Sequence, residues 1–386
     1  MKYEKLALDL VEFSRELFPG LEFIPLHAPQ FSSEEERILV DTVRSTFVST
    51  VGEYVGEFER LIESFTSAKF AVAMNSGTAA LHIALLVSGV SENDEVLTQP
   101  VTFVATGNAI RYCGADPVFL DIERETLGLS PDSLEQFLAE HAELRRDGKC
   151  WNVRTGRRIM ACVPVNSLGH PARVQEIRQI CDRYHVKVVE DAAESLGSWI
   201  GSTHTGLGGD AGVLSFNGNK VITTGGGGAI ITDNQDLASR AKHISSTAKK
   251  AHKWEFFHDC LGFNYRLPNI NAALGCAQMG KISSFLERKR RNADRYAIWA
   301  MDRGVKYVSE PKDACSNFWL NALLLPDRKA RDEVLEVTNN NGVMTRPLWT
   351  PLNLLPMYKN CLSMDLPVSA DIFNRLVCLP SSASES

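Results

Sequence analysis

The feature that most constrains the fold of this chain is a series of short apolar runs, most of them separated by helical stretches. The runs lie at residues 70–73, 95–98, 117–120, 159–163, 186–189, 212–215 and 228–231. Runs of this length are typical of buried strands, and residues 78–86 and 174–184 are typical of the helices between them. Strands that alternate with helices predict an α/β fold with a mainly parallel seven-stranded sheet, flanked by helices on both faces.

The pattern changes on either side of this region. Residues 6–17 have the spacing of an amphipathic helix, and a hydroxyl cap followed by acidic residues at 32–35 predicts the start of another. Residues 269–303 predict one or two long helices, and residues 305–346 mix short strands with a helix. We therefore expect an N-terminal helical extension (1–32), a large α/β domain (33–260) and a smaller α+β C-terminal domain (261–386).

The charge balance argues against several kinds of partner. The chain has 41 basic and 47 acidic residues, a net charge of −6, whereas nucleic-acid binding needs a concentrated basic field. The densest basic run, Arg288–Arg291, is interpreted as a solvated helix face. No run reaches the roughly eighteen apolar residues that cross a bilayer, and the charged start does not match a secretory signal. We expect a cytoplasmic protein with no nucleic-acid or membrane partner.

The cysteines do not predict a metal site. There are nine, widely spaced and without a C-x-x-C pair, so neither a zinc site nor a disulfide framework is indicated. We interpret them as buried free thiols and expect no metal.

The candidate functional residues lie in loops that follow predicted strands, which is where parallel sheets bind their ligands. Residues 75–80 are small and hydroxyl-bearing and run into a helix, whose first N–H groups favour an anion. Residues 190–197 place carboxylates at the end of a buried strand, where ionised acids need a positive partner. A helix cap is the alternative explanation for each of these loops taken alone.

Two further loops add a lysine and an aromatic ring. Lys220 lies between a buried strand and the four glycines at 225–228, a setting in which desolvation lowers the pKa of an amine and makes it nucleophilic. Phe103 follows another strand and can stack on a planar ligand. An exposed lysine and a core phenylalanine are the alternatives. Together, an anion cradle, an acid, an imine-forming lysine and an aromatic platform are the parts that a pyridoxal phosphate (PLP) site needs.

The sequence resembles the DegT/DnrJ/EryC/StrS sugar aminotransferases, which have the PLP-dependent aminotransferase fold type I. The resemblance covers roughly residues 25–350 and rests on EDAAES at 190–195, SFNGNK at 215–220 and GFNYRL at 262–267. The segment at 49–52, the FNGNK run and the helix before Phe23 are most similar to the branch that aminates C4 of nucleotide-linked 4-keto-6-deoxy-N-acetylhexosamines.

The resemblance implies a role for each matching residue. Lys220 would bond to the aldehyde carbon of PLP and then move a proton. Asp191 would keep the pyridinium nitrogen protonated, and Glu194 would lie near the ring hydroxyl. Phe103 would stack on the ring. Glu194 stands where family members often have histidine or glutamine.

The phosphate and substrate contacts follow in the same way. Gly77, Thr78 and Ser215 would hold the phosphate, and Asn264 would reach the phosphate bound by a neighbouring subunit. A homodimer with shared active sites is therefore implied. The candidates for substrate contact are His258, Tyr265, Arg266 and Trp349, each of which core packing or salt bridging also explains.

The function expected on this basis is transamination from an amino acid, with glutamate as the expected donor, to a nucleotide-linked ketosugar. A sugar dehydratase of the same family is an alternative, but in those relatives histidine replaces the lysine. An NAD-dependent enzyme would need an early G-x-G-x-x-G, which only residues 206–211 approximate. A non-catalytic protein of the same fold is the third alternative, and the presence of Lys220 and Asp191 argues against it.

Overall fold

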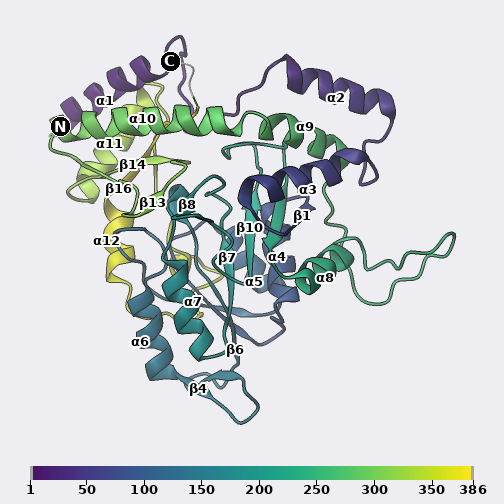
Figure 1. Cartoon of the computed structure of the whole chain (residues 1–386). Coiled ribbons are helices and arrows are strands. Elements are labelled where there is room, and N and C mark those ends of the chain that lie inside the picture. Colours follow the sequence, from purple (N-terminus) through teal and green to yellow (C-terminus); the bar gives the residue numbers. More distant parts are fainter. Residues whose placement is uncertain (1–2, 384–386) are drawn as a thin grey trace.

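All seven predicted strands enter one sheet in the computed structural model, which describes residues 3–383 (Figure 1). The strands are β1 (Phe70–Met74), β2 (Glu95–Thr98), β3 (Asp116–Phe119), β6 (Ile159–Val163), β7 (Lys187–Asp191), β10 (Ala211–Ser215) and β11 (Gly228–Thr232). Their order is β1-β11-β10-β7-β6-β2-β3. Strands β10, β7, β6, β2 and β3 pair in parallel, whereas β11 is antiparallel to both of its neighbours. The predicted α/β fold with a mainly parallel sheet is confirmed.

Helices cover both faces of this sheet, because its strands alternate their side chains between two apolar clusters. On β1, Val72 and Met74 belong to one cluster and Ala71 and Ala73 to the other. The first face is covered by α4 (Gly77–Val87), α5 (Ala105–Tyr112) and α8 (Gln235–Ser245). The second is covered by α3 (Glu53–Thr66), α6 (Pro131–His141), α7 (Val174–Arg183) and α9 (Asn269–Met279).

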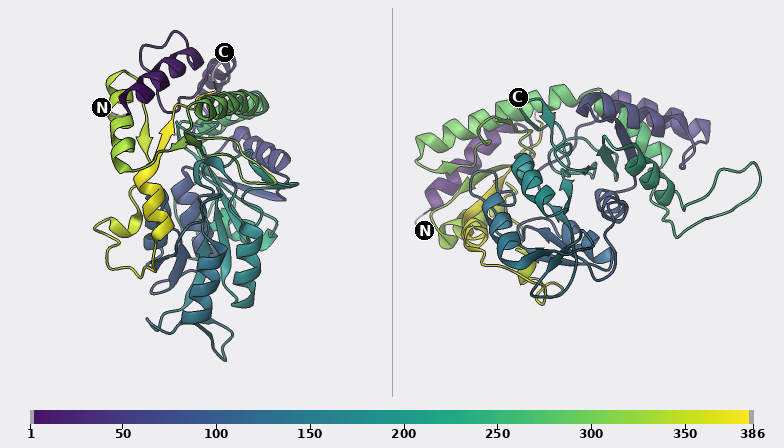
Figure 2. Two further views of the ribbon diagram at one scale, coloured as in Figure 1. Left: turned by 90° about the vertical axis from the view of Figure 1, so that its left-hand side faces the viewer. Right: turned by 60° about the horizontal axis from the view of Figure 1, so that its bottom comes forward.

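The C-terminal part forms a smaller sheet of β12 (Lys306–Tyr307), β14 (Asn321–Leu324), β16 (Leu376–Leu379) and β15 (Arg346–Pro347). It is accompanied by α10 (Ile282–Asp302), α11 (Arg328–Asn340) and α12 (Pro367–Arg375), as the two views of Figure 2 show. The N-terminal helix α1 (Glu4–Leu17) shares an apolar cluster with α10 and α11, so the two ends of the chain pack together.

The remaining elements are short, apart from α2 (Ser33–Ser45). Helix α2 begins with the predicted cap, a reciprocal capping box between Ser32 and Glu35. The others are β4 (Ala142–Leu144), β5 (Cys150–Asn152), β8 (Trp199–Ile200), β9 (Thr203–His204), β13 (Ala314–Cys315) and two 3₁₀ turns, Ser167–Gly169 and Leu352–Leu354. The domain boundaries at residues 32 and 260 stay predictions.

Two sequence interpretations are wrong in part. Lys289, in the basic run expected to be solvated, is 1% exposed and lies under the C-terminal segment, and Arg290 pairs with Glu310 at 2.9 Å. The partners of both residues are distant in the sequence, so the charge pattern could not indicate them. The cysteines are free, but Cys260 and Cys315 are exposed.

Helices that combine the length and the hydrophobicity needed to cross a lipid bilayer do not occur within residues 3–383.

Candidate active site

A cavity of about 350 Å³ lies where β1, β2, β7 and β10 end. This is the edge of a parallel sheet at which ligands bind in open α/β folds. Its wall combines the four predicted loops with Trp319 and Trp349 from the C-terminal part. Eight predicted residues line it: Gly77, Thr78, Phe103, Asp191, Glu194, Ser215, Lys220 and Trp349.

Lys220 stands on the turn after β10. The turn is anchored by Phe216, which is fully buried and contacts the ring of Phe58 edge-on. Its N–H donates a hydrogen bond to the carbonyl of Gly227, and its carbonyl accepts one from the N–H of Thr224. The side chain of Lys220 is 14% exposed, and its Nζ lies 3.7 Å from Oε1 of Glu194. Burial lowers the pKa of Lys220, although the neighbouring carboxylates oppose that shift. A partly desolvated amine of this kind can act as a nucleophile and as a proton carrier.

Asp191 is the last residue of β7 and is 7% exposed. Its Oδ2 accepts a hydrogen bond from Oγ1 of Thr106 at 2.8 Å, and its Oδ1 accepts one from the N–H of Ala193 at 3.2 Å. Burial raises the pKa of Asp191, and these two donors and the charge of Lys220 partly offset the rise. A fixed, buried carboxylate is suited to bind a protonated ring nitrogen.

Glu194 lies on the other side of the amine. Its Oε2 accepts a hydrogen bond of 2.9 Å from the N–H of Leu168, a residue in the left-handed conformation with φ of 59°. Burial raises the pKa of Glu194 to about 7, with Lys220 opposing the rise. The side chain can therefore exchange a proton near neutral pH, beside the lysine.

The start of α4 forms an anion cradle against the end of β10. Ser76 caps the helix by accepting a hydrogen bond from the N–H of Ala79 at 3.1 Å. A Cβ on Gly77 would come within 2.9 Å of the Cβ of Ser215, so the close approach of α4 to β10 requires glycine here. Gly77, Thr78 and Ser215 line the cavity beside this contact, and the N–H groups of a helix start together with hydroxyls suit a phosphate.

Aromatic side chains close the remaining sides. Phe103 is 53% exposed at the edge of the cavity, positioned to cover a planar ring. Trp349 stacks on Trp319 with ring centroids 6.4 Å apart and an interplanar angle of 9°. The acid, the amine, the anion cradle and these rings together match the groups that PLP carries, so the residues present fit this cofactor.

Four predicted residues do not line this cavity. Asn264 and His258 belong to residues 247–264, a projecting segment between α8 and α9 that we call the arm (Figure 1). His258 is hydrogen-bonded through Nδ1 to the carbonyl of Thr247 at 2.8 Å. Tyr265 stacks on Phe263, and Arg266 pairs through its backbone with Met74. Direct contact of these four residues with a bound ligand therefore requires a cavity other than this one.

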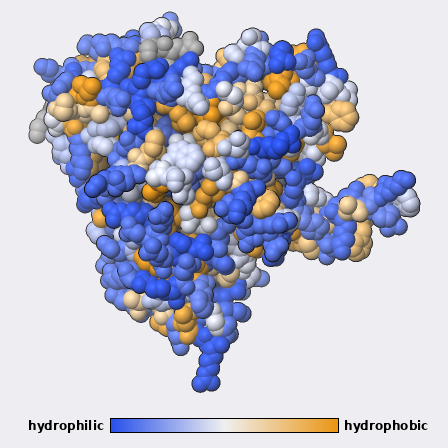
Figure 3. Space-filling model, viewed as in Figure 1, coloured by the Kyte–Doolittle hydropathy of each residue, from blue (hydrophilic) through white to orange (hydrophobic). Residues whose placement is uncertain are grey.

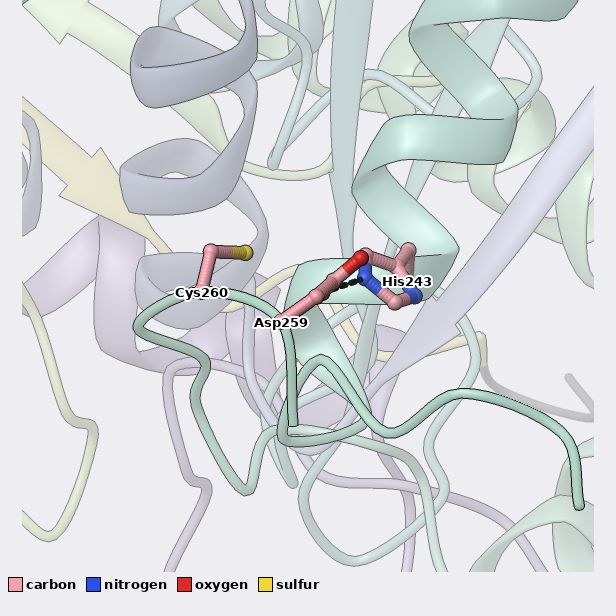
Figure 4. Close-up of side chains that lie close together, drawn as sticks. All are labelled: His243, Asp259 and Cys260. Atoms are coloured by element: carbon pink, nitrogen blue, oxygen red, sulfur yellow. Dashed lines mark hydrogen bonds and ion pairs between the residues drawn. The ribbon is translucent and has the colours of Figure 1, made fainter. Parts of the chain in front are cut away.

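A cluster of possible metal ligands occurs at the base of the arm (Figure 4). His243, Asp259 and Cys260 have ligand atoms within 4.8 Å of one another. Nε2 of His243 lies 2.7 Å from Oδ1 of Asp259, and Nζ of Lys250 lies 3.5 Å from Oδ2. The hydrogen bond from His243 lowers the pKa of Asp259. Because His243 and Lys250 already bind the carboxylate of Asp259, we infer that the cluster attaches the arm to α8.

Sequence reasoning missed two residues of the site. Thr106, which holds Asp191, stands in the first turn of α5, and its signal was a hydroxyl in a loop that follows a strand. Trp319 lies with its ring centroid 4.0 Å from the Nζ of Lys220. It had no local signal, because 99 positions separate the two residues in the chain and only folding brings them together.

Comparisons with known proteins agree over nearly the whole chain. The model of the DegT/DnrJ/EryC1/StrS aminotransferase family matches residues 29–385. The protein EpsN of Bacillus subtilis is 36% identical over 367 residues, covering 94% of this chain and 91% of EpsN. GDP-perosamine synthase of Escherichia coli O157:H7 is 32% identical over 366 residues, covering 95% of each chain.

Solved structures agree on the fold. A DegT DnrJ EryC1 StrS aminotransferase from Brucella abortus superposes with a TM-score of 0.83 at 25% identity, over 92% of this chain and 91% of the other. DesI, solved in the presence of its TDP-sugar product, gives a TM-score of 0.81 at 25% identity, over 97% and 91%.

Proposed function

This chain belongs to the DegT/DnrJ/EryC1/StrS aminotransferase family and is PLP-dependent, and we propose that its substrate is a nucleotide-linked ketosugar. The amino group passes from an amino-acid donor, glutamate, to C4 of a 4-keto-6-deoxy-N-acetylhexosamine. The observation that carries the proposal is the position of the largely buried Lys220 amine in a cavity that also holds Asp191 and an anion cradle. The names of GDP-perosamine synthase and of the DesI complex support the sugar class.

We assign a separate role in the reaction to each residue of the cavity. When bound, PLP supplies an electron sink that stabilises negative charge on the carbon next to the transferred nitrogen. Asp191 holds a proton on the ring nitrogen, which strengthens that sink. The Nζ of Lys220 takes the proton from the carbon and returns it, and burial, which lowers the pKa of this amine, favours its neutral form. Glu194 orients the amine from 3.7 Å.

The same residues bind and shield the cofactor. Gly77, Thr78 and Ser215 hold its phosphate, and Phe103 covers a face of its ring. Trp319 and Trp349, stacked on each other, form part of the cavity wall. Electrostatic interactions between the buried groups of the cavity are stronger than in bulk solvent.

The sugar assignment is tested with a panel of UDP-, GDP- and dTDP-linked 4-ketosugars, each incubated with glutamate and the holoenzyme. We expect release of 2-oxoglutarate with one nucleotide class, together with an aminated sugar detected by mass spectrometry. Omitting the sugar is the control and should allow no more than one turnover for each active site. Absence of 2-oxoglutarate with every sugar would contradict the proposal, whereas a deoxygenated sugar without an amine would indicate the dehydratase alternative.

We further propose that the enzyme is a homodimer in which the arm of one subunit reaches the cavity of the other. Large apolar side chains on the arm are strongly exposed: Trp254 by 71%, Phe256 by 79%, Phe257 by 58% and Leu261 by 83%. Figure 3 shows apolar side chains on this projecting segment. Exposing them to water is unfavourable, and a second copy of the chain would bury them. Asn264, at the base of the arm where its backbone pairs with Ser246, would then contact the phosphate in the partner's cavity.

Replacing Trp254 and Phe256 together with aspartate is expected to weaken the dimer, because charged side chains would have to be desolvated in the interface. Sedimentation velocity should show a larger monomer fraction and PLP should dissociate more readily. The matched control is Val153→Asp, which alters a 54% exposed apolar residue outside the arm, directly after β5. Equal monomer fractions in the arm variant, the control and the unchanged protein would contradict the proposed interface.

A further inference from the structure

A buried lysine outside the cavity holds the tryptophan that contacts the reactive amine. Lys289 lies on α10 and is 1% exposed. Its Nζ donates hydrogen bonds to the carbonyl of Trp319 at 3.1 Å and to the carbonyl of Ser381 at 2.5 Å. Burying an amine is unfavourable unless it makes hydrogen bonds, so these two contacts account for its place in the interior.

The indole of Trp319 contacts the lysine turn in two ways. Its ring centroid lies 4.0 Å from the Nζ of Lys220, a distance at which the ring face attracts a cation. Its Nε1 donates a hydrogen bond of 2.7 Å to the carbonyl of Asn219, the residue before the lysine. A shift of this indole would therefore move both the amine and the backbone that carries it.

The backbone of Trp319 is held from two directions. Its N–H donates to Oδ1 of Asn317 at 2.7 Å, and the amide of Asn317 donates to the carbonyl of Glu194 at 2.8 Å. The carbonyl of Trp319 accepts the hydrogen bond from Lys289. Asn317 therefore connects Trp319 to the loop with the acids, and Lys289 connects it to the C-terminal segment.

The C-terminal segment at 380–382 is the other anchor of Lys289. The N–H of Ser381 donates to the carbonyl of Leu26 at 2.8 Å, and its Oγ accepts a bond from the N–H of Asn321. Tyr296, two turns further along α10, donates through its hydroxyl to the carbonyl of Pro380 at 3.0 Å. Both α10 side chains thus hold the same segment, but only Lys289 also bonds Trp319.

We propose that Lys289 is a positioning residue for the transamination site, which acts by fixing the indole of Trp319 against the amine of Lys220. This inference rests on the proposed function. Without the Lys289 amine, the carbonyl of Trp319 loses its hydrogen bond and the indole gains freedom to move. The amine of Lys220 would then spend less time in the reactive orientation, and its environment would change.

The test is a double-mutant cycle with Lys289→Met and Trp319→Phe, in which phenylalanine keeps a ring but lacks the bond to Asn219. Two quantities are measured on the PLP-loaded proteins: the rate at which glutamate bleaches the visible cofactor band, and the pH midpoint of that band without glutamate. We expect each single variant to react about tenfold more slowly at saturating glutamate and to shift the midpoint, with little change in KM. The double variant should be no slower than the slower single variant, because both substitutions disrupt the same contact, that of the Trp319 indole with the Lys220 amine.

Tyr296→Phe is the matched control, since it loosens the same C-terminal segment without touching Trp319. It should lower the melting temperature but leave the bleaching rate and the midpoint unchanged. The proposal would be overturned if the rate losses of Lys289→Met and Trp319→Phe multiply in the double variant, or if Tyr296→Phe is as slow as Lys289→Met. Either result would leave Lys289 a purely structural role. If Lys289→Met does not fold, a normal rate and midpoint in Trp319→Phe would overturn it equally. Failure of glutamate to bleach the unchanged protein would contradict the proposed function instead.

Discussion

The Lys220→Ala variant is expected to lose transamination, by at least about a thousandfold in turnover, because within residues 3–383 no other lysine lines the cavity. The reaction needs a base that removes a proton and returns it at a neighbouring atom. Alanine offers neither the nucleophile nor the proton carrier. The variant should also lack the visible absorption that the unchanged protein shows when PLP is bonded to this side chain.

Borohydride reduction followed by peptide mass spectrometry provides the direct measurement. The mass of the reduced cofactor should appear on the peptide that contains Lys220 in the unchanged protein and be absent from the variant. Lys306→Ala removes an exposed lysine of β12 and serves as the control, with normal colour and turnover expected. A yellow, active Lys220→Ala protein would show that another residue carries the chemistry.

The second large effect is expected from Asp191→Asn, which keeps the size of the side chain but removes its negative charge. An amide cannot hold a proton on the ring nitrogen, so the electron sink weakens while the phosphate cradle still binds the cofactor. Turnover should fall by about a hundredfold or more, with little loss of bound PLP. Rapid-mixing absorbance with glutamate and the PLP content of the purified protein measure the two quantities separately.

Glu190→Gln offers a matched control for this variant. Glu190 precedes Asp191 on β7 and is 1% exposed, but its carboxylate faces away from the cavity and accepts bonds from Asn166 at 2.8 Å and from the N–H of Gly208 at 3.2 Å. Its neutralisation is expected to cost stability and to leave the rate of the folded enzyme near normal. Similar rate losses for Asp191→Asn and Glu190→Gln would show that the effect comes from disturbing the strand rather than from the cofactor site.

Much of the fold could be predicted because its signals are local. Each buried strand is a short apolar run, and each helix that follows has its own spacing and caps, as at Ser32 and Glu35. The residues of the cavity could be predicted for a related reason. Strands that run in parallel end at the same edge, so Ser215 at the end of β10 and Asp191 at the end of β7 are brought to one cavity by the topology.

Residues whose role depends on contacts between distant segments could not be predicted. Lys289 belongs to a basic run that is typical of a solvated helix face, yet its partners are carbonyls at residues 319 and 381. A carbonyl is present at every residue, so the sequence carries no mark of which one a lysine will reach. For the arm, the sequence signal was present but the location was not predictable. Residues 262–264 match a family motif, yet they lie outside the cavity of their own chain.

By itself, then, the sequence determined the strands and helices, the edge of the sheet that carries the chemistry, and the amine and acid at its centre. These depend on side-chain periodicity and on residues close to strand ends, which are local properties. Only the tertiary structure decided that Thr106 holds the acid, that the indole of Trp319 lies against the amine, and that a lysine in the interior fixes this indole. Such contacts form when segments that are distant in the sequence pack together, and packing is decided by the shape of the whole molecule rather than by any one stretch of residues.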